Sequence, residues 1–348
     1  MKRLLAWLVL SALILNSCSN EYLDYHKDQL NFKSESDVAA KEDVQFKIED
    51  IEVRDLEVVW ITPDKTLLEK LVSKIENAQQ RVYLEVYILT EKRIIKSLKD
   101  AKQRWLDVRV ILEKNVYWAW NMNKKSFDAL VSAWIDVKYA NNWNYRYTHA
   151  KFFLIDDAYV ISTGNMSFST FAYNKDLLLF WNNKEDVIML EELFKKDSKW
   201  EKFIKCDATL VISPKCPREQ FMSILGSAKE SIYVYAETLD DYEIEALLVE
   251  KDKEWADVKI LLWDINKIKS NKGPLERLQK LWINIIAPKK PYIHAKALFI
   301  DWKIAYIGSI NFSTNSIENN REIWMIFKND IIVDKLKNEF LTIFLNKQ

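Results

Sequence analysis

Hydrophobic positions follow two alternating periodicities from residue 64 onward. Apolar residues recur at helical spacing over residues 67–75 and 94–103, whereas apolar, partly β-branched runs occupy residues 81–88 and 108–112. The first spacing predicts helices and the second predicts strands. Helices that alternate with strands are typical of an α/β fold with a largely parallel central sheet, so we predict this fold class.

The same order of segments returns about 150 residues later. Residues 228–234 match residues 78–84, and residues 254–262 match residues 104–112, both at an offset of 150. A constant offset over several segments indicates an internal duplication. We therefore predict two repeats, one at residues 56–203 and one at residues 204–348.

Two of the three histidines lie in the same sequence context, one in each repeat. Each copy has the pattern His-x-Lys-x4-Asp, given by His149, Lys151 and Asp156 in the first repeat and by His294, Lys296 and Asp301 in the second. Because side chains alternate along a strand, the histidine and lysine of each copy project to one face. Both copies continue to an asparagine and then to an acidic residue, namely Asn165 and Asp176 or Asn311 and Glu322.

This duplicated pattern resembles the phospholipase D superfamily, and specifically its members with two such motifs in one chain. The resemblance extends over residues 60–340 or so. It implies two phospholipase D-like repeats, each a mostly parallel sheet flanked by helices. It also implies that the repeats pack about a pseudo-twofold axis and share one active site, so that a monomer suffices for catalysis.

Phosphodiester cleavage needs a nucleophile, a proton donor for the leaving alkoxide and positive charge around the phosphoryl oxygens. Two imidazoles can divide the first two tasks, because each titrates near neutral pH. The resemblance implies that His149 is the nucleophile, which forms a phosphohistidine. It implies that His294 protonates the leaving group and then activates the incoming water or alcohol.

The remaining motif residues are assigned to charge stabilisation and orientation. Lys151, Lys296, Asn165 and Asn311 are expected to hold the nonbridging oxygens, a task that a metal performs in other phosphodiesterases, so neither a metal nor a cofactor is expected. The resemblance implies that Glu322 and Asp176 orient the opposing histidines. Asp156 and Asp301 belong to the same candidate set, with a structural role in the turn after the motif strand favoured over a catalytic one.

The first copy departs from the second in three places. Its turn is one residue shorter, Ser162 replaces the equivalent of Gly308, and Asp176 replaces the usual glutamate. Aspartate shortens the reach to the imidazole by one methylene. We expect these changes to reduce activity at most, and not to abolish it.

The N-terminus has the pattern of a secretory signal. Lys2 and Arg3 precede an apolar stretch of about a dozen residues, which is too short to span a bilayer comfortably. The following Leu15-Asn16-Ser17-Cys18 resembles a bacterial lipobox, so we predict a signal peptide over residues 1–17 and lipidation of Cys18. The polar residues 18–55 then form a tether, which predicts a protein anchored to the membrane of the bacterial cell envelope. The alternatives are an uncleaved membrane anchor and a plain signal with an incidental cysteine.

The other two cysteines, Cys206 and Cys216, lie on either side of a strand-like run. Outside the cytoplasm they can pair, but the ten residues between them must then double back. Zinc binding is disfavoured, because no second pair of Cys or His accompanies them. The sequence leaves open whether they form a disulfide.

Charge and location together favour a substrate class. The chain carries 51 basic and 51 acidic residues, so it has no overall attraction to nucleic acid. A lipid anchor would keep the active site near a membrane, which favours phospholipid head groups as substrate. A nuclease of the same superfamily and a catalytically inactive binding protein are the alternatives.

Glycine and tryptophan occur in unusual numbers. The chain has 4 glycines and 14 tryptophans, and average glycine usage predicts about two dozen. Several tryptophans stand where backbone conformation favours glycine, after a helix or in a hairpin turn: Trp105, Trp134, Trp255, Trp282 and Trp302. Our hypothesis is that these are glycines in the cell, encoded by UGA in a bacterium that reads this codon as glycine. The alternative is a tryptophan-rich protein whose aromatic rings bind lipid or sugar.

Overall fold

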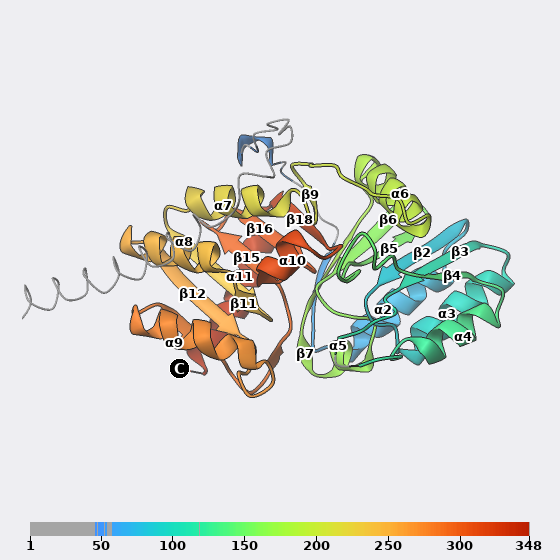
Figure 1. Ribbon diagram of the computed structural model, residues 1–348, viewed down its shortest axis with the longest axis horizontal. Helices are drawn as coiled ribbons and strands as arrows, with labels where there is room; N and C mark the ends of the chain where they lie inside the picture. Colours follow the sequence, from blue (N-terminus) through green and yellow to red (C-terminus); the bar gives the residue numbers. More distant parts are fainter. Residues whose placement is uncertain (1–45, 47, 52, 54–57, 118, 348) are drawn as a thin grey trace, which may run out of the picture.

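The computed structural model describes residues 58–117 and 119–347, together with residues 46, 48–51 and 53. The predicted signal peptide, Cys18 and most of the predicted tether lie outside these residues. Two α/β lobes lie side by side, the first repeat from blue to green and the second from yellow to red (Figure 1). In the described part of the chain, no helix is long and apolar enough to cross a membrane.

The first repeat runs from β1 to α6. Its elements are β1 (Val58–Ile61), α2 (Lys65–Glu76), β2 (Arg81–Val86), α3 (Lys92–Gln103), β3 (Asp107–Leu112), α4 (Lys124–Val131), β4 (Asp136–Tyr139), β5 (Lys151–Ile155), β6 (Ala158–Ser162), α5 (Phe168–Ala172), β7 (Asn174–Lys175), β8 (Leu177–Trp181) and α6 (Lys184–Ser198). The helices and strands expected between residues 67 and 112 are confirmed, each within two residues at its ends. Helix α2 illustrates the cause: Asp64 caps it by accepting from the Thr66 amide at 2.8 Å, and its buried residues repeat at helical spacing.

The second repeat has the same order of main elements. These are β9 (Leu210–Ile212), α7 (Pro217–Ser227), β10 (Ser231–Ala236), β11 (Leu239–Asp240), α8 (Tyr242–Lys253), β12 (Asp257–Leu262), the 3-10 helix η3 (Lys269–Asn271), α9 (Lys272–Lys280), β13 (Asn284–Ile286), β14 (Tyr292–Ile293), β15 (Ala297–Ile300), β16 (Ile304–Gly308), β17 (Phe312–Ser313), α10 (Thr314–Glu318), β18 (Ile323–Lys328) and α11 (Asp330–Leu345).

Each repeat contains one mixed seven-stranded sheet, and the two sheets have the same topology. The strand orders are β1-β8-β6-β5-β2-β3-β4 and β13-β12-β10-β15-β16-β18-β9, one the reverse of the other. In the first sheet β2, β3 and β4 pair in parallel, while every pairing on the other side of β2 is antiparallel. Only β5 and β8 run against the other five strands. The expected α/β class is therefore confirmed, and the sequence-adjacent strands β5 and β6 account for the antiparallel part, because a short hairpin joins them.

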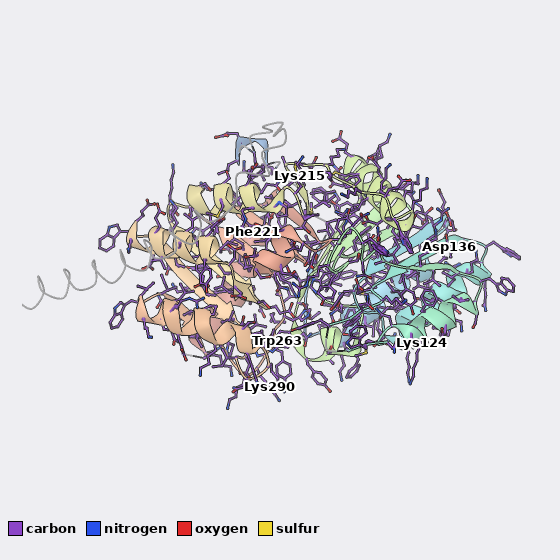
Figure 2. The ribbon with its side chains drawn as sticks, in the orientation of Figure 1. Lys124, Asp136, Lys215, Phe221, Trp263 and Lys290 are labelled. Atoms are coloured by element: carbon purple, nitrogen blue, oxygen red, sulfur yellow. A yellow bond between two sulfur atoms is a disulfide. The ribbon has the colours of Figure 1, made fainter. Side chains whose placement is uncertain are left out.

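The two sheets face each other across a shared core. Apolar side chains from β5, β6, β15 and β16 pack there with helices α6 and α11. Helices α2, α3 and α4 cover the outer face of the first sheet, and α7, α8 and α9 cover that of the second. Side chains of both lobes meet between the sheets, and Phe221 of α7 lies in the outer core of the second repeat (Figure 2). The duplication therefore produces one continuous structure.

One end of the predicted tether packs on the fold. Ile51 is 2% exposed and belongs to the outer core of the second repeat, and the 3-10 helix η2 (Ile48–Asp50) precedes it. The Lys328 ammonium donates to the Ile48 carbonyl at 2.9 Å. This part of residues 18–55 is therefore bound to the second repeat, which the polar composition of the segment did not predict.

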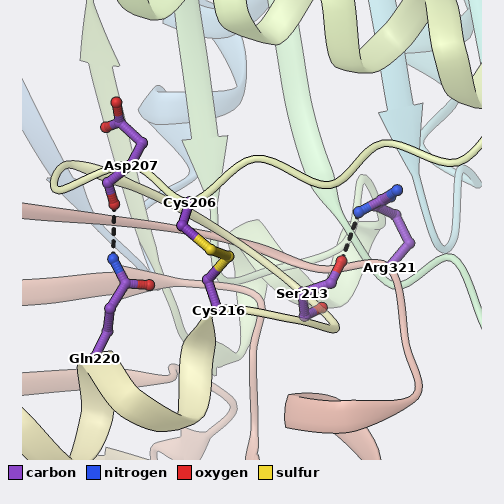
Figure 3. Close-up of a disulfide and its surroundings, with 6 residues drawn as sticks. All are labelled: Cys206, Asp207, Ser213, Cys216, Gln220 and Arg321. Atoms are coloured by element: carbon purple, nitrogen blue, oxygen red, sulfur yellow. Dashed lines mark hydrogen bonds between the residues drawn. A yellow bond between two sulfur atoms is a disulfide. The ribbon is translucent and has the colours of Figure 1, made fainter. Parts of the chain in front are cut away.

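Cys206 and Cys216 form a disulfide, which settles the alternative that the sequence left open. Their Cα atoms lie 5.5 Å apart, because the chain reverses direction between β9 and α7 (Figure 3). Gln220 of α7 donates to the Asp207 carbonyl at 2.7 Å on the same side of the reversal. The disulfide and this hydrogen bond together attach the start of the second repeat to its first helix.

Among the described residues, six tryptophans adopt the left-handed backbone conformation that favours glycine. The φ angles are 69° for Trp105, 60° for Trp134, 62° for Trp200, 73° for Trp255, 67° for Trp282 and 64° for Trp302. This conformation costs an L-residue about 1–2 kcal/mol, and bulky residues adopt it rarely. Trp105 and Trp255 are 94% and 93% exposed, so packing does not compensate for the strain. The five positions expected from the sequence all have this geometry, and Trp200 adds a sixth.

Candidate active site

Each motif segment forms backbone hydrogen bonds with the opposite repeat. The amides of His149 and Ala150 both donate to the Arg321 carbonyl of the second repeat, at 2.8 and 2.9 Å. In the second copy, His294 and Ala295 donate to the Lys175 carbonyl of the first repeat, at 3.2 and 2.8 Å. Strands β14 and β7 also pair in parallel across the boundary. Each histidine is therefore positioned by the backbone of the opposite repeat.

Each imidazole binds a carboxylate from the opposite repeat. His149 Nδ1 lies 2.8 Å from Glu322 Oε2, and His294 Nδ1 lies 2.7 Å from Asp176 Oδ1. A carboxylate at Nδ1 fixes the orientation of the ring and leaves Nε2 for the reaction. The shorter side chain of Asp176 reaches its histidine at the same distance as Glu322 does.

Gly164 makes this approach of Asp176 feasible. A Cβ atom at residue 164 would lie 2.7 Å from the Asp176 carboxyl carbon, which is closer than Cβ atoms come to other atoms in proteins. The Thr163 hydroxyl donates to Asp176 Oδ1 at 2.7 Å and supports the same carboxylate. Gly164 and Thr163 therefore allow the shorter Asp176 side chain of the first copy to reach its histidine.

Both histidines line one cavity of about 590 Å³ between the repeats. Tyr87 and Asn165 contribute to its wall from the first repeat, and Glu237 and Trp263 contribute from the second. Trp263 is labelled where the two lobes meet in Figure 2, and its ring contacts that of His294 edge-on at 5.3 Å. Two carboxylate-oriented imidazoles in one cavity are an arrangement for acid–base and nucleophilic chemistry.

Comparison with known proteins agrees with this geometry. A family model described as the cardiolipin synthase, phospholipase D-like domain matches residues 71–198 and again residues 221–344. The chain belongs to the phospholipase D-like family.

Relatives within the phospholipase D-like family match one or both repeats. A phospholipase D from Rickettsia bellii is 31% identical over 119 residues, which is 34% of this chain and 59% of the relative. The chain therefore matches about three fifths of that relative's length. A cardiolipin synthase from Clostridium perfringens is 22% identical over 332 residues, covering 79% of this chain and 67% of the relative.

Solved structures share the fold over most of the chain. Phosphatidylserine synthase from Haemophilus influenzae aligns with a TM-score of 0.64 at 11% identity, covering 86% of this chain and 87% of that one. A polyphosphate kinase from Porphyromonas gingivalis aligns with a TM-score of 0.61 at 14% identity, covering 81% of this chain and 46% of that one. At these identities the likeness concerns the fold of the phospholipase D-like repeats.

The two motif lysines lie beside the histidines in unlike environments. Lys151 is fully buried and donates to the His149 carbonyl at 2.6 Å. Burial, reinforced by the nearby Lys296, lowers the pKa of Lys151 to about 7. Lys296 donates to the His294 carbonyl at 2.7 Å and forms an ion pair with Glu237. The positive charge for a phosphoryl group therefore depends on pH at Lys151 and is partly neutralised at Lys296.

The environment of His149 favours its neutral form. Burial lowers the pKa of His149, and the charges of Lys151 and Lys296 act in the same direction, against Glu322. Burial alone would raise the pKa of Glu322, but His149 and Lys151 hold it below its usual value. A neutral imidazole with a free ring nitrogen is the form that attacks phosphorus.

The two asparagines are not equivalent. Asn165 lines the cavity, and its side-chain oxygen has no hydrogen-bond partner among the described residues. The side-chain oxygen of Asn311 instead accepts from the Thr238 amide at 3.2 Å. The Asn165 side chain is thus unpartnered at the cavity wall, while Asn311 holds the loop after β10. In the described part of the chain, no group of His, Cys, Asp and Glu side chains is placed to hold a metal ion.

Asp156 and Asp301 were candidates for the catalytic set, and the structure places them outside the cavity. Asp156 accepts from the amides of Gln79, Gln80 and Arg81 at 2.8–3.0 Å. Asp301 accepts in the same way from the three amides of residues 229–231. Both have positive φ in the turn after the motif strand, which aspartate tolerates better than most residues. Both carboxylates are thus engaged by turn amides outside the cavity, and a structural role stays the favoured prediction.

We expect Asp301→Ala to destabilise the protein and to leave the turnover number of the folded enzyme nearly unchanged. The variant loses one charged acceptor shared by three amides, which costs about 2–3 kcal/mol. Urea unfolding and initial rates on the same samples measure both effects. A large loss of turnover with unchanged unfolding would instead place Asp301 in catalysis.

Glu237 and Tyr87 were not predicted as site residues. Each is the first residue after the strand that pairs with its motif strand, and the two lie 150 residues apart, the repeat offset. The signal that could have found them is this position, because side chains at the end of a strand next to the motif strand reach the same cavity.

The buried Arg321 is a second unpredicted feature. Its side chain forms an ion pair with Asp197 at 2.9 Å and donates to the carbonyls of Ser213 and Phe203 (Figure 3). These contacts fix the backbone carbonyl that holds His149. A buried arginine is stable only with acceptors around its guanidinium, and the loss of one partner is costly.

Proposed function

We propose that the protein cleaves phosphodiester bonds of phospholipid head groups through a phosphohistidine at His149. One observation carries this proposal: both motif histidines line the same cavity, and each has its Nδ1 on a carboxylate of the opposite repeat. The neutral form favoured at His149 suits a nucleophile, and His294 is left for proton transfer.

The reaction has two steps in this proposal. His149 Nε2 forms a bond to phosphorus, the bond from phosphorus to the leaving oxygen breaks, and His294 gives its proton to that oxygen. Water or an alcohol then attacks phosphorus, returns a proton to His294, and breaks the bond to His149. Water gives hydrolysis and an alcohol gives phosphatidyl transfer. Lys151 and Asn165 stabilise the charge on the phosphoryl oxygens, whereas the Lys296 ammonium is paired with Glu237.

The choice of a lipid substrate has three supports. The relative from Clostridium perfringens, which covers most of this chain, is a cardiolipin synthase. Basic and acidic residues balance at 51 each, which does not favour a nucleic acid. The proposed lipid anchor at Cys18 keeps the cavity near a membrane of the cell envelope.

The test supplies both substrate classes to the same enzyme. Purified protein, with the printed sequence and with glycine at the six strained tryptophan positions, is incubated with mixed phospholipid vesicles and with DNA. We expect released head groups or a transferred phosphatidyl group, and no such product from His149→Ala. Cleavage of DNA without lipid products would assign a nuclease instead. The anchor is tested separately, since Cys18→Ser should move the protein out of the membrane fraction.

A further inference from the structure

Glu237 and Tyr87 occupy equivalent positions in the two repeats. Tyr87 follows β2 and Glu237 follows β10, the strands that pair with the motif strands β5 and β15. The carbonyl of Tyr87 accepts from the Asn123 side chain at 2.7 Å, and that of Glu237 accepts from Asn271 at 2.8 Å. The backbone at these two positions is therefore held alike in both repeats, whereas their side chains differ in chemistry.

In the first repeat the position is neutral. The Tyr87 ring meets the His149 ring edge-on, with centroids 4.6 Å apart. Its hydroxyl accepts from the Tyr117 amide at 2.7 Å. No negative charge therefore stands at this position beside His149, whose carboxylate partner Glu322 is at Nδ1.

In the second repeat the side chain at the equivalent position, Glu237, is an anion. Glu237 forms an ion pair with Lys296, and its Oε1 lies 3.6 Å from His294 Nε2. Although burial acts to raise the pKa of Glu237, His294 and Lys296, and to a smaller extent His149, hold it far below its usual value. Asp176 is at Nδ1 of the same ring, 2.7 Å away. His294 thus has a carboxylate at both ring nitrogens, whereas His149 has one.

This difference bears on which ring attacks phosphorus. A phosphodiester is an anion, and attack by Nε2 brings its nonbridging oxygens close to the ring and the motif lysine. At His294 these oxygens would lie beside the Glu237 carboxylate, and the Lys296 ammonium that could bind them is already paired with Glu237. The negative charges of the phosphodiester and of Glu237 would therefore repel each other in the cavity. Proton transfer to a leaving oxygen does not require the phosphoryl oxygens to occupy that place.

We propose that Glu237 is a specificity-determining residue that directs the phosphoryl group to His149 by excluding it from Nε2 of His294. This inference rests on the phosphohistidine of the proposed function. The asymmetry of the two histidines is then a property of one side chain, and not of the two motifs themselves.

The experiment uses a phosphodiester with a 4-nitrophenolate leaving group. Nitrophenolate leaves with the electron pair of its bond to phosphorus and needs no proton, so each histidine can be tested as a nucleophile without the other. The attacking Nε2 forms the bond to phosphorus in the same step. Peptide mass mapping at neutral pH locates the phosphoryl group, and absorbance measures the released nitrophenolate.

We expect the wild type and His294→Ala to carry the phosphoryl group on His149, and His149→Ala to carry none. The double variant His149→Ala/Glu237→Gln should carry it on His294. Its nitrophenolate burst should exceed that of His149→Ala by at least about ten-fold, since the charge repulsion is removed. Glu237→Asp in the same background keeps the charge and should remain unlabelled.

Two outcomes separate this inference from the proposed function. An unlabelled double variant, when Glu237→Gln alone still labels His149 and is therefore folded, would overturn the role of Glu237. Absence of label from both the wild type and His294→Ala would instead overturn the phosphohistidine, and the inference with it.

Discussion

Replacement of His149 by alanine is expected to lower the rate of phosphodiester cleavage by about four orders of magnitude or more, as the loss of a covalent nucleophile does in other enzymes. The reason is geometric as well as chemical. Glu322 fixes the ring at 2.8 Å through Nδ1, so a water molecule in the space left by the ring lacks that orientation. Initial rates of head-group release and mapping of the phosphoryl adduct measure the effect.

The variant also affects stability, which the experiment must separate from catalysis. Without the ring, the fully buried Glu322 loses one partner and keeps the Asn320 side chain, which donates to it at 3.0 Å, at a cost of about 1–3 kcal/mol in stability. Circular dichroism at the assay temperature shows whether the variant is folded. His26→Ala is the matched control, because this third histidine lies in the polar N-terminal segment, and its rate should equal that of the wild type. A folded His149→Ala variant with more than a tenth of the wild-type rate would contradict the assignment.

Local sequence patterns predicted the helices and strands of the fold, but not the backbone hydrogen bonds that join the two repeats. The helices and strands between residues 67 and 112 follow from periodicity, and the second repeat follows from the offset of 150. Nothing in periodicity indicates that Arg321 holds the backbone of His149, or that Lys175 holds that of His294. Such contacts join residues far apart in sequence, and the resemblance to a two-motif family implied only a shared active site and the carboxylates that orient the opposing histidines.

The sequence predicted the site residues whose type is the same in both repeats, and it missed those whose type differs between the repeats. His149 and His294, with their carboxylates, stand out because both copies keep the same types. Glu237 and Tyr87 differ between the copies, so a comparison that looks for matching residues passes over them. Asp156 and Asp301 show the converse, because they match in both copies and yet stabilise a turn outside the cavity.

The six left-handed tryptophans give the second large prediction, which concerns stability. We expect a variant with glycine at Trp105, Trp134, Trp200, Trp255, Trp282 and Trp302 to unfold at a higher urea concentration than the printed sequence. Each L-residue in this conformation costs about 1–2 kcal/mol, and the greater flexibility of glycine when unfolded offsets about 0.5–1 kcal/mol of that. The net gain is therefore about 0.5–1 kcal/mol at each of the four sites whose rings are 75–94% exposed, and these distant sites add to about 2–4 kcal/mol. No gain is counted for Trp302, whose ring packs on Tyr233, or for Trp200, whose indole donates to the Tyr139 carbonyl.

A buried tryptophan outside the left-handed conformation serves as the control, because its replacement by glycine should lower the stability. Trp60 is 5% exposed and stacks on Phe180 with ring centroids 6.3 Å apart, so Trp60→Gly should lower the free energy of unfolding by about 3–5 kcal/mol. The gene itself gives an independent test, since our hypothesis requires UGA codons at the six positions. UGG codons there, or a six-glycine variant less stable than the printed sequence, would contradict it. If both tests agree, the turns at these positions are glycine turns, and indole rings there have no role in binding lipid or sugar.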